Sequence, residues 1–205
     1  MSETDAKRRA VRPRHAASMI VLRRGREGVE LLMGTRAAGH RFMPNRLVFP
    51  GGAVERADFT AESASRLSPA TAAMLEKGAK PPLARALAIA AVRELAEETG
   101  LSLGNPPALG GLFYLCRAIT PASSPIRFHA RFLMVEAEGL EGALGGSGEL
   151  EGLRFYKVDE AQAAELPWIT ARVIEEVAAW LRLPEEVRFA TRPSAVFRSR
   201  GRAEE

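Results

Sequence analysis

The sequence predicts a mixed α/β fold, in which a β-sheet with mixed strand directions lies between helices. Strand-like apolar segments occur both before and after a long alanine-rich segment that favours a helix. A second helical segment follows the last of these strands. The chain has 205 residues, of which 46% are hydrophobic and 26% are charged, and this composition fits one globular domain.

The first predicted elements form a hairpin. Residues 16–22 are apolar and favour a strand, residues 25–28 contain two glycines and favour a turn, and residues 29–35 supply the partner strand. Residues 37–46 combine small, basic and turn-forming residues and predict a loop.

Two helices with clear terminal signals follow. Residues 69–76 predict a short helix with Ser68 as N-cap and Pro69 at its first position. Residues 83–99 predict a long helix, and Gly100 is placed to end it as a C-cap. A helix this apolar is buried on most sides.

The second half of the chain predicts three further strands and two helices. The strands are predicted at residues 109–119, 127–136 and 153–158, and residues 139–148 form a glycine-rich connection. The helices are predicted at residues 160–164 and 168–182, and apolar residues at helical spacing would pack the second against the sheet.

Three carboxylates near the end of the long helix form the main functional signal. Glu94, Glu97 and Glu98 stand at positions i, i+3 and i+4, which share one face of a helix. Crowded carboxylates resist ionisation, and a hard cation such as Mg²⁺ with oxygen ligands removes the conflict. The pattern predicts metal-assisted attack on a phosphate ester or anhydride. The alternative is a solvated helix face, the usual role of a run of charges.

The segment Phe49-Pro50-Gly51-Gly52 favours the catalytic interpretation, because its glycines permit close backbone approach. Together with residues 93–101 it resembles the signature of the Nudix hydrolase family, whose second half, Arg-Glu-x-x-Glu-Glu-x-Gly and an apolar residue, is intact. The first half is altered, since Asp58 stands where the family has its first Glu. We interpret residues 59–82 as an insertion within the signature. The resemblance implies an α/β/α sandwich.

The resemblance also implies a metal site. Glu94, Glu97 and Glu98 would hold Mg²⁺ or Mn²⁺ together with the carbonyl of Gly52, and Glu94 would also act in catalysis. Arg93 resembles the family arginine that pairs with an acid and holds the helix end in place.

Further acids and arginines are candidates for supporting roles. Asp58 is either the partner of Arg93 or without a role, and Glu62 is a second candidate for the altered position. Many relatives recruit a general base from a loop beyond the signature, and Glu149, after the glycine-rich segment, is the candidate here, with Glu151 close behind. Solvated loop acids are the alternative. Arg36 and Arg41 could bind phosphate, because guanidinium groups pair bidentately with phosphate oxygens.

The reaction implied is hydrolysis of a pyrophosphate that joins a nucleoside to another moiety, giving a nucleoside monophosphate and a phosphorylated product. Residues 41–44 and 48–52, with the insertion, partly resemble the acyl-coenzyme A diphosphatase branch, so CoA or acyl-CoA is one expected substrate. ADP-ribose, NADH and dinucleoside polyphosphates are alternatives. A Nudix-like sensor that binds a nucleotide without turnover is a further alternative, and RNA decapping is another.

The charge distribution argues against a nucleic-acid partner. Residues 1–14 and 187–205 each carry five basic and two acidic residues, which gives +3 for each of these predicted tails, so residues 15–186, the predicted domain, carry −2 of the net +4. No apolar run approaches a membrane span and the N-terminus lacks the apolar stretch of a secretory signal, so we expect a cytoplasmic protein without a membrane partner. Cys116 cannot form an internal disulfide and is expected to be buried. The sequence leaves a homodimer open.

Overall fold

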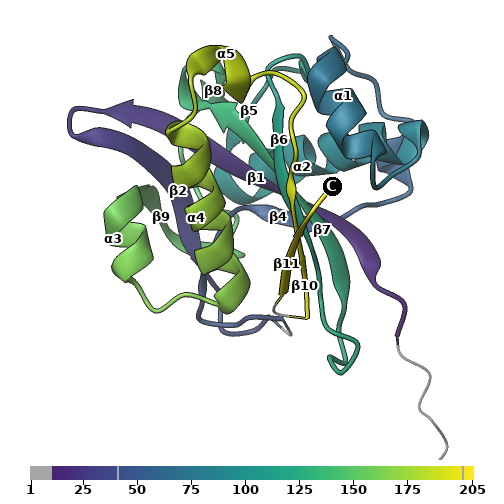
Figure 1. Cartoon of the computed structure of the whole chain (residues 1–205). Helices are drawn as coiled ribbons and strands as arrows, with labels where there is room; N and C mark the ends of the chain where they lie inside the picture. The colour runs from purple at the N-terminus through teal and green to yellow at the C-terminus, as the bar shows by residue number, and fades with distance from the viewer. Residues whose placement is uncertain (1–10, 41, 200) are drawn as a thin grey trace, which may run out of the picture.

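A mixed sheet forms the centre of the molecule in the computed structural model, which describes residues 11–40, 42–199 and 201–205 (Figure 1). Its strands are β1 (Arg14–Gly25), β2 (Gly28–Arg36), β3 (Leu47–Val48), β4 (Gly51–Ala53), β6 (Phe113–Ile119), β7 (Phe128–Glu136), β9 (Leu150–Lys157), β10 (Ala195–Arg198) and β11 (Gly201–Glu204). They follow the order β11-β10-β6-β7-β1-β2-β3, with β4 paired to β1 and β9 to β2. β1 is parallel to β7 and β10 to β6, and the other pairs are antiparallel. The predicted mixed α/β fold is confirmed.

Helices cover both faces of this sheet. The helical elements are η1 (Ala57–Phe59), α1 (Pro69–Glu76), α2 (Pro81–Thr99), η2 (Ala137–Gly139), α3 (Val158–Ala163), α4 (Trp168–Leu181) and α5 (Glu185–Arg188). α4 crosses the near face in Figure 1, while α1 and α2 lie on the other face. A separate pair, β5 (Leu101–Ser102) with β8 (Glu141–Gly142), follows the end of α2. None of the helices in the described ranges is long and apolar enough to cross a membrane.

The alternating side chains of β1 divide the core into two layers. Ala17, Met19 and Val21 pack with the residues of α1 and α2. Ile20 and Leu22 point to the opposite face and pack with α3 and α4. This period of two is what places apolar residues on both faces of a sheet covered on both sides.

The predicted N-cap of α1 and the predicted C-cap of α2 are confirmed. Ser68 caps α1, since its hydroxyl accepts from the N–H of Thr71 at 3.2 Å. Gly100 ends α2 in the left-handed conformation with φ 75°, where its N–H donates to Ala96 O. α2 begins at Pro81, two residues before the predicted start, because proline is well suited to the first helical turn.

The segment between β4 and α2, which we interpreted as an insertion, packs on the sheet. Met74 and Leu75 of α1 belong to the core next to α2. The hydroxyl of Thr71 donates to Leu112 O at 2.7 Å, which ties α1 to the start of β6. The segment therefore packs α1 beside α2 and connects β4 to the start of α2.

The structure corrects the predicted C-terminal tail. Residues 195–198 and 201–204 form β10 and β11, and β10 extends the central sheet by pairing with β6. Counting charges hid the apolar run Ala195-Val196-Phe197, which is buried. Of the predicted N-terminal tail, residues 1–10 lie outside the described residues and Arg14 already begins β1.

Two predicted strands have different boundaries. The strand predicted at residues 109–119 begins only at Phe113, because Gly110 and Gly111 form a turn before it. The strand predicted at residues 153–158 begins at Leu150 and pairs with β2.

Candidate active site

The backbone of Gly51 and Gly52 lies against the acidic face of α2. β4 pairs with the first half of β1, and the N–H of Gly51 donates to Glu98 Oε2 at 2.8 Å. A Cβ at position 52 would overlap the carboxylate of Glu94, so any larger residue there would displace that carboxylate. The two sequence motifs therefore meet in space, as their combination predicts.

Glu98 is a buried carboxylate with incomplete hydrogen bonding. Its side chain is 1% exposed, and Oε1 has no hydrogen-bond partner among the described residues. Burial raises the pKa of Glu98 to about 7. The Gly51 hydrogen bond and the charge of Arg36 lower this pKa, whereas the charges of Glu94 and Glu149 raise it.

Glu94 and Glu97 lie on the same helix face at increasing exposure. The side chain of Glu94 is 13% exposed and that of Glu97 is 58% exposed. Burial raises the pKa of Glu94, Arg93 lowers it, and the charges of Glu97 and Glu149 raise it. The predicted carboxylate face therefore exists, and its negative charges oppose one another.

Arg93 is the centre of an ion-pair network at the end of the helix. Its Nη1 donates to Glu94 Oε1 at 2.9 Å and to Glu97 Oε2 at 3.0 Å. Its Nε donates to Asp58 Oδ1 at 3.0 Å, and its Nη2 donates to Ala53 O at 3.1 Å. Arg93 thus joins α2 to η1 and β4, which is the positioning role that the resemblance implied.

Asp58 is the partner of Arg93. Its side chain is 1% exposed, and Oδ2 accepts both from Arg93 Nη2 at 3.3 Å and from the N–H of Glu55 at 2.7 Å. Glu62, the other candidate for this position, is exposed. The shorter acid therefore serves as a structural anchor.

Glu149 lies near the carboxylates at the end of the glycine-rich loop. The loop is tied at one end by Gly145 N–H to Thr99 O at 2.8 Å, and at the other by Ala37 N–H to Glu149 O at 3.0 Å. Glu149 is exposed, yet its charge reaches both Glu94 and Glu98 and raises their pKa values. Its side chain is thus near the site but open to water.

Arg36 lies beside the backbone of Gly51. Its Nη2 points to Gly51 O at 3.5 Å, and its buried Nε has no hydrogen-bond partner among the described residues. The other predicted phosphate ligand, Arg41, lies outside the described residues. Arg36 therefore offers an unpaired donor at the mouth of the neighbouring cavity.

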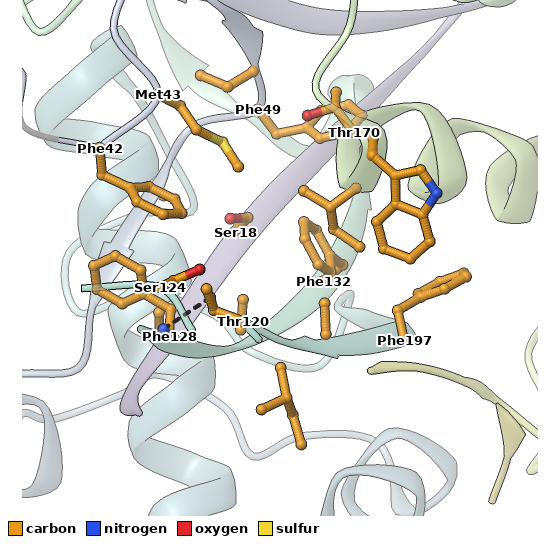
Figure 2. Close-up of a pocket in the computed structure, with 18 of the residues that line it drawn as sticks. Ser18, Phe42, Met43, Phe49, Thr120, Ser124, Phe128, Phe132, Thr170 and Phe197 are labelled. Atoms are coloured by element: carbon orange, nitrogen blue, oxygen red, sulfur yellow. Dashed lines mark hydrogen bonds between the residues drawn. The ribbon is translucent and has the colours of Figure 1, made fainter. Parts of the chain in front are cut away.

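A cavity of about 380 Å³ opens beside Arg36 and the two glycines. Figure 2 shows aromatic side chains on opposite sides of it, with Phe42 and Phe128 on one side and Phe197 on the other. Phe42 and Phe128 form an edge-to-face pair at 5.1 Å between ring centroids, and Trp168 and Phe197 form another at 5.9 Å. The site thus combines an acidic helix face with an apolar pocket.

Sequence reasoning missed this aromatic cavity. The four aromatic residues come from a loop, β7, α4 and β10, so that no sequence spacing connects them. The apolar run that contains Phe197, in the segment predicted as a tail, was the one available signal.

The acidic face fits a divalent cation with oxygen ligands. Among residues 11–40, 42–199 and 201–205, no three His, Cys, Asp or Glu side chains form a ready-made metal cluster, and Arg93 pairs with both Glu94 and Glu97. Glu98 Oε1, however, is buried and unpartnered, and burial raises the pKa values of Glu94 and Glu98, so a cation would stabilise their ionised forms. The two histidines His15 and His129 contact Arg131 and Arg117 instead.

A family model described as the NUDIX domain matches residues 84–177. A NUDIX hydrolase from Alicyclobacillus acidocaldarius has a similar structure, with a TM-score of 0.63 and 26% identity over 82% of this chain and 92% of that chain. Among curated proteins, a search finds no match.

Two other similar structures share the fold at lower identity. The MutT NUDIX hydrolase from Burkholderia pseudomallei has a TM-score of 0.53 and 19% identity, over 82% of this chain and 99% of that chain. The NUDIX domain of Shewanella oneidensis NrtR, solved with ADP ribose, has a TM-score of 0.55 and 14% identity, over 88% of this chain and 99% of that chain.

Proposed function

We propose that this chain, whose residues 84–177 match the NUDIX domain model, is a Nudix hydrolase that hydrolyses a pyrophosphate joining a nucleoside to a second moiety. One observation carries the proposal. Gly51 and Gly52 line a cavity of about 380 Å³, and the N–H of Gly51 also binds Glu98, a buried carboxylate whose other oxygen has no partner among the described residues. A solvated helix face would not bury Glu98.

The residues divide into holding and reacting groups. Glu94, Glu97 and Glu98, with the carbonyl of Gly52, would hold Mg²⁺ or Mn²⁺. When bound, the cation supplies neutralisation of the diphosphate charge and a lower pKa for water. Arg93 positions Glu94 and Glu97, because it bonds both and is anchored by Asp58.

Glu149 and Arg36 would complete the reaction. Water attacks one phosphorus atom, the anhydride P–O bond breaks, and the water proton passes to Glu149 acting as general base. Arg36 would donate to a phosphate oxygen, since its Nε has no partner among the described residues and it lines the cavity. The products are a nucleoside monophosphate and a phosphorylated second moiety.

The test is a hydrolysis panel with Mg²⁺ or Mn²⁺ over ADP-ribose, NADH, diadenosine polyphosphates, CoA and acyl-CoA, with products identified by mass. CoA and acyl-CoA stay in the panel as our finer proposal, although none of the compared proteins is named for CoA. We expect Glu98→Gln and Glu149→Gln to reduce kcat by about a hundredfold or more while the folded fraction stays the same. The exposed Glu62→Gln is the matched control and should keep full activity.

Absence of turnover on every substrate and with both metals would remove the enzyme proposal. A sensor would bind a member of the panel without converting it, and Glu149→Gln would then leave its binding unchanged.

A further inference from the structure

The hairpin β10–β11 lies outside the segment that matches the NUDIX domain, yet it forms part of the candidate active site. The match ends at residue 177, and β10 begins at Ala195. β10 pairs in parallel with β6, which sets Phe197 opposite Ala118. Both Phe197 and the following Ser199 line the cavity.

Phe197 closes one side of the cavity with Trp168. Their rings meet edge to face, with an interplanar angle of 88°. Phe197 is 1% exposed and Trp168 is 39% exposed, so the pair joins a buried part of the cavity lining to a part that is open to solvent. Such a wall favours an apolar or aromatic group.

An ion pair fastens the hairpin to the sheet. Arg117 of β6 binds Glu205 with two bonds, from Nε to Oε1 at 2.8 Å and from Nη2 to Oε2 at 2.6 Å. The two side chains are 13% and 15% exposed. Backbone bonds between Ser194 and Glu205, at 3.1 and 3.2 Å, close the base of the hairpin.

A second contact fastens the hairpin to α4. Arg202 Nε of β11 donates to Glu176 Oε1 of α4 at 2.7 Å. Since α4 also carries Trp168, the hairpin contacts α4 at two places, through this ion pair and through the contact between the rings of Phe197 and Trp168. The hairpin is thus held in position by side chains outside the cavity.

We propose that the β10–β11 hairpin is a specificity element, which selects substrates carrying an apolar group by placing Phe197 in the cavity wall. Arg117 and Glu205 are positioning residues, because they hold the strand that carries Phe197 without lining the cavity. The inference rests on the proposed function, in that the cavity receives one side of the cleaved diphosphate. The apolar group is either a nucleobase or an acyl chain.

Binding without turnover tests the hairpin separately from hydrolysis. The chain has two tryptophans, and Trp180 is 3% exposed, so ligand-dependent fluorescence should come from Trp168 and vanish in Trp168→Phe. In EDTA, the protein is titrated with octanoyl-CoA against CoA, and with ADP against ribose 5-phosphate. We expect either octanoyl-CoA to bind at least about tenfold tighter than CoA, or ADP to bind at least about tenfold tighter than ribose 5-phosphate. The first result would identify an acyl chain as the apolar group, and the second would identify a nucleobase.

Variants of the ion pair then test the positioning role. Glu205→Gln should reduce this preference about fivefold or more and raise KM with kcat nearly unchanged, because a charged bidentate pair is lost. Glu205→Asp should restore most of the preference. Glu175→Gln, which removes an exposed pair with Arg172 elsewhere on α4, is the control.

Equal affinity within both pairs, or no fluorescence response to any probe, would overturn the proposal. So would a preference that Glu205→Gln and Phe197→Leu leave intact. If the hydrolysis panel fails but the binding preference follows Glu205, the proposed function is wrong and the hairpin still forms the binding specificity.

Discussion

Replacing Glu98 by glutamine should stabilise the metal-free protein at neutral and alkaline pH. The buried carboxylate has one unpartnered oxygen and lies near Glu94 and Glu149. Glutamine removes the charge and can still accept from the N–H of Gly51. The folded state should therefore lose a penalty that burial of this carboxylate imposes.

The magnitude follows from the pKa of Glu98, which burial raises from 4.5 to about 7. Below about pH 4.5 the group is protonated in both the folded and the unfolded chain and contributes nothing. Between these values the folded protein binds the extra proton, so the stability of the wild type falls as pH rises. Above about pH 7 the full difference of about 3 kcal/mol separates the wild type from Glu98→Gln.

The assay is urea unfolding in EDTA at pH 4.5 and pH 8. We expect Glu98→Gln to gain about 3 kcal/mol over the wild type between the two pH values, whereas Glu97→Gln, whose side chain is 58% exposed, should change little. Saturating Mg²⁺ at pH 8 should stabilise the wild type more than Glu98→Gln. Parallel pH dependence in the wild type and Glu98→Gln would refute the reasoning.

Two further substitutions test the geometry of the site. Gly52→Ala should lower kcat about a hundredfold, because the new Cβ displaces the carboxylate of Glu94. The free energy of unfolding should fall by less than about 1 kcal/mol, since the end of the Glu94 side chain can move. Steady-state kinetics and thermal unfolding measure the two effects, and Gly111→Ala, at a position with open space around it, is the control. Asp58→Asn should destabilise the protein by about 3 kcal/mol in urea unfolding, because Arg93 would lose its buried anionic partner; a change within about 0.5 kcal/mol would contradict the anchoring role.

Local signals in the sequence predicted the parts of the fold that local chemistry determines. Ser68, Pro69 and Gly100 mark helix ends that depend on a few neighbouring residues, and the structure has them where predicted. The i, i+3, i+4 spacing placed Glu94 and Glu98 on one face, and the glycine pair indicated a close approach to that face.

Elements made by long-range pairing were missed. β3 and β4 have two and three residues, and they exist because they pair with β2 and β1 rather than through any propensity of their own. β10 depends on parallel pairing with β6, whose paired residues 116–119 lie far away in the sequence from residues 195–198. Basic residues around it suggested a solvated tail, because a count of charges ignores which side of a strand they occupy.

The cavity could not be derived for the same reason. Phe42, Phe128, Trp168 and Phe197 gain their common role only when a loop, two strands and one helix converge. The overall aromatic content of the sequence is 6%. It said nothing about a pocket, which needs only a few aromatic residues gathered at one place.

The arrangement of charges explains why the carboxylates of the site add little to the stability of the folded protein and are suited to binding a cation. Arg93 has Asp58 as a buried partner and can hold the helix end by this pair alone, so its bonds to Glu94 and Glu97 are additional. Within the described part of the chain, Glu98 accepts a hydrogen bond only from Gly51 N–H, and the charge of Arg36 lowers its pKa without a direct bond. A fold selected for stability alone would pair this buried oxygen or replace it with an apolar group. The site instead keeps an ionisable oxygen beside a glycine backbone and an apolar cavity, the combination required where a cation and a diphosphate must bind together.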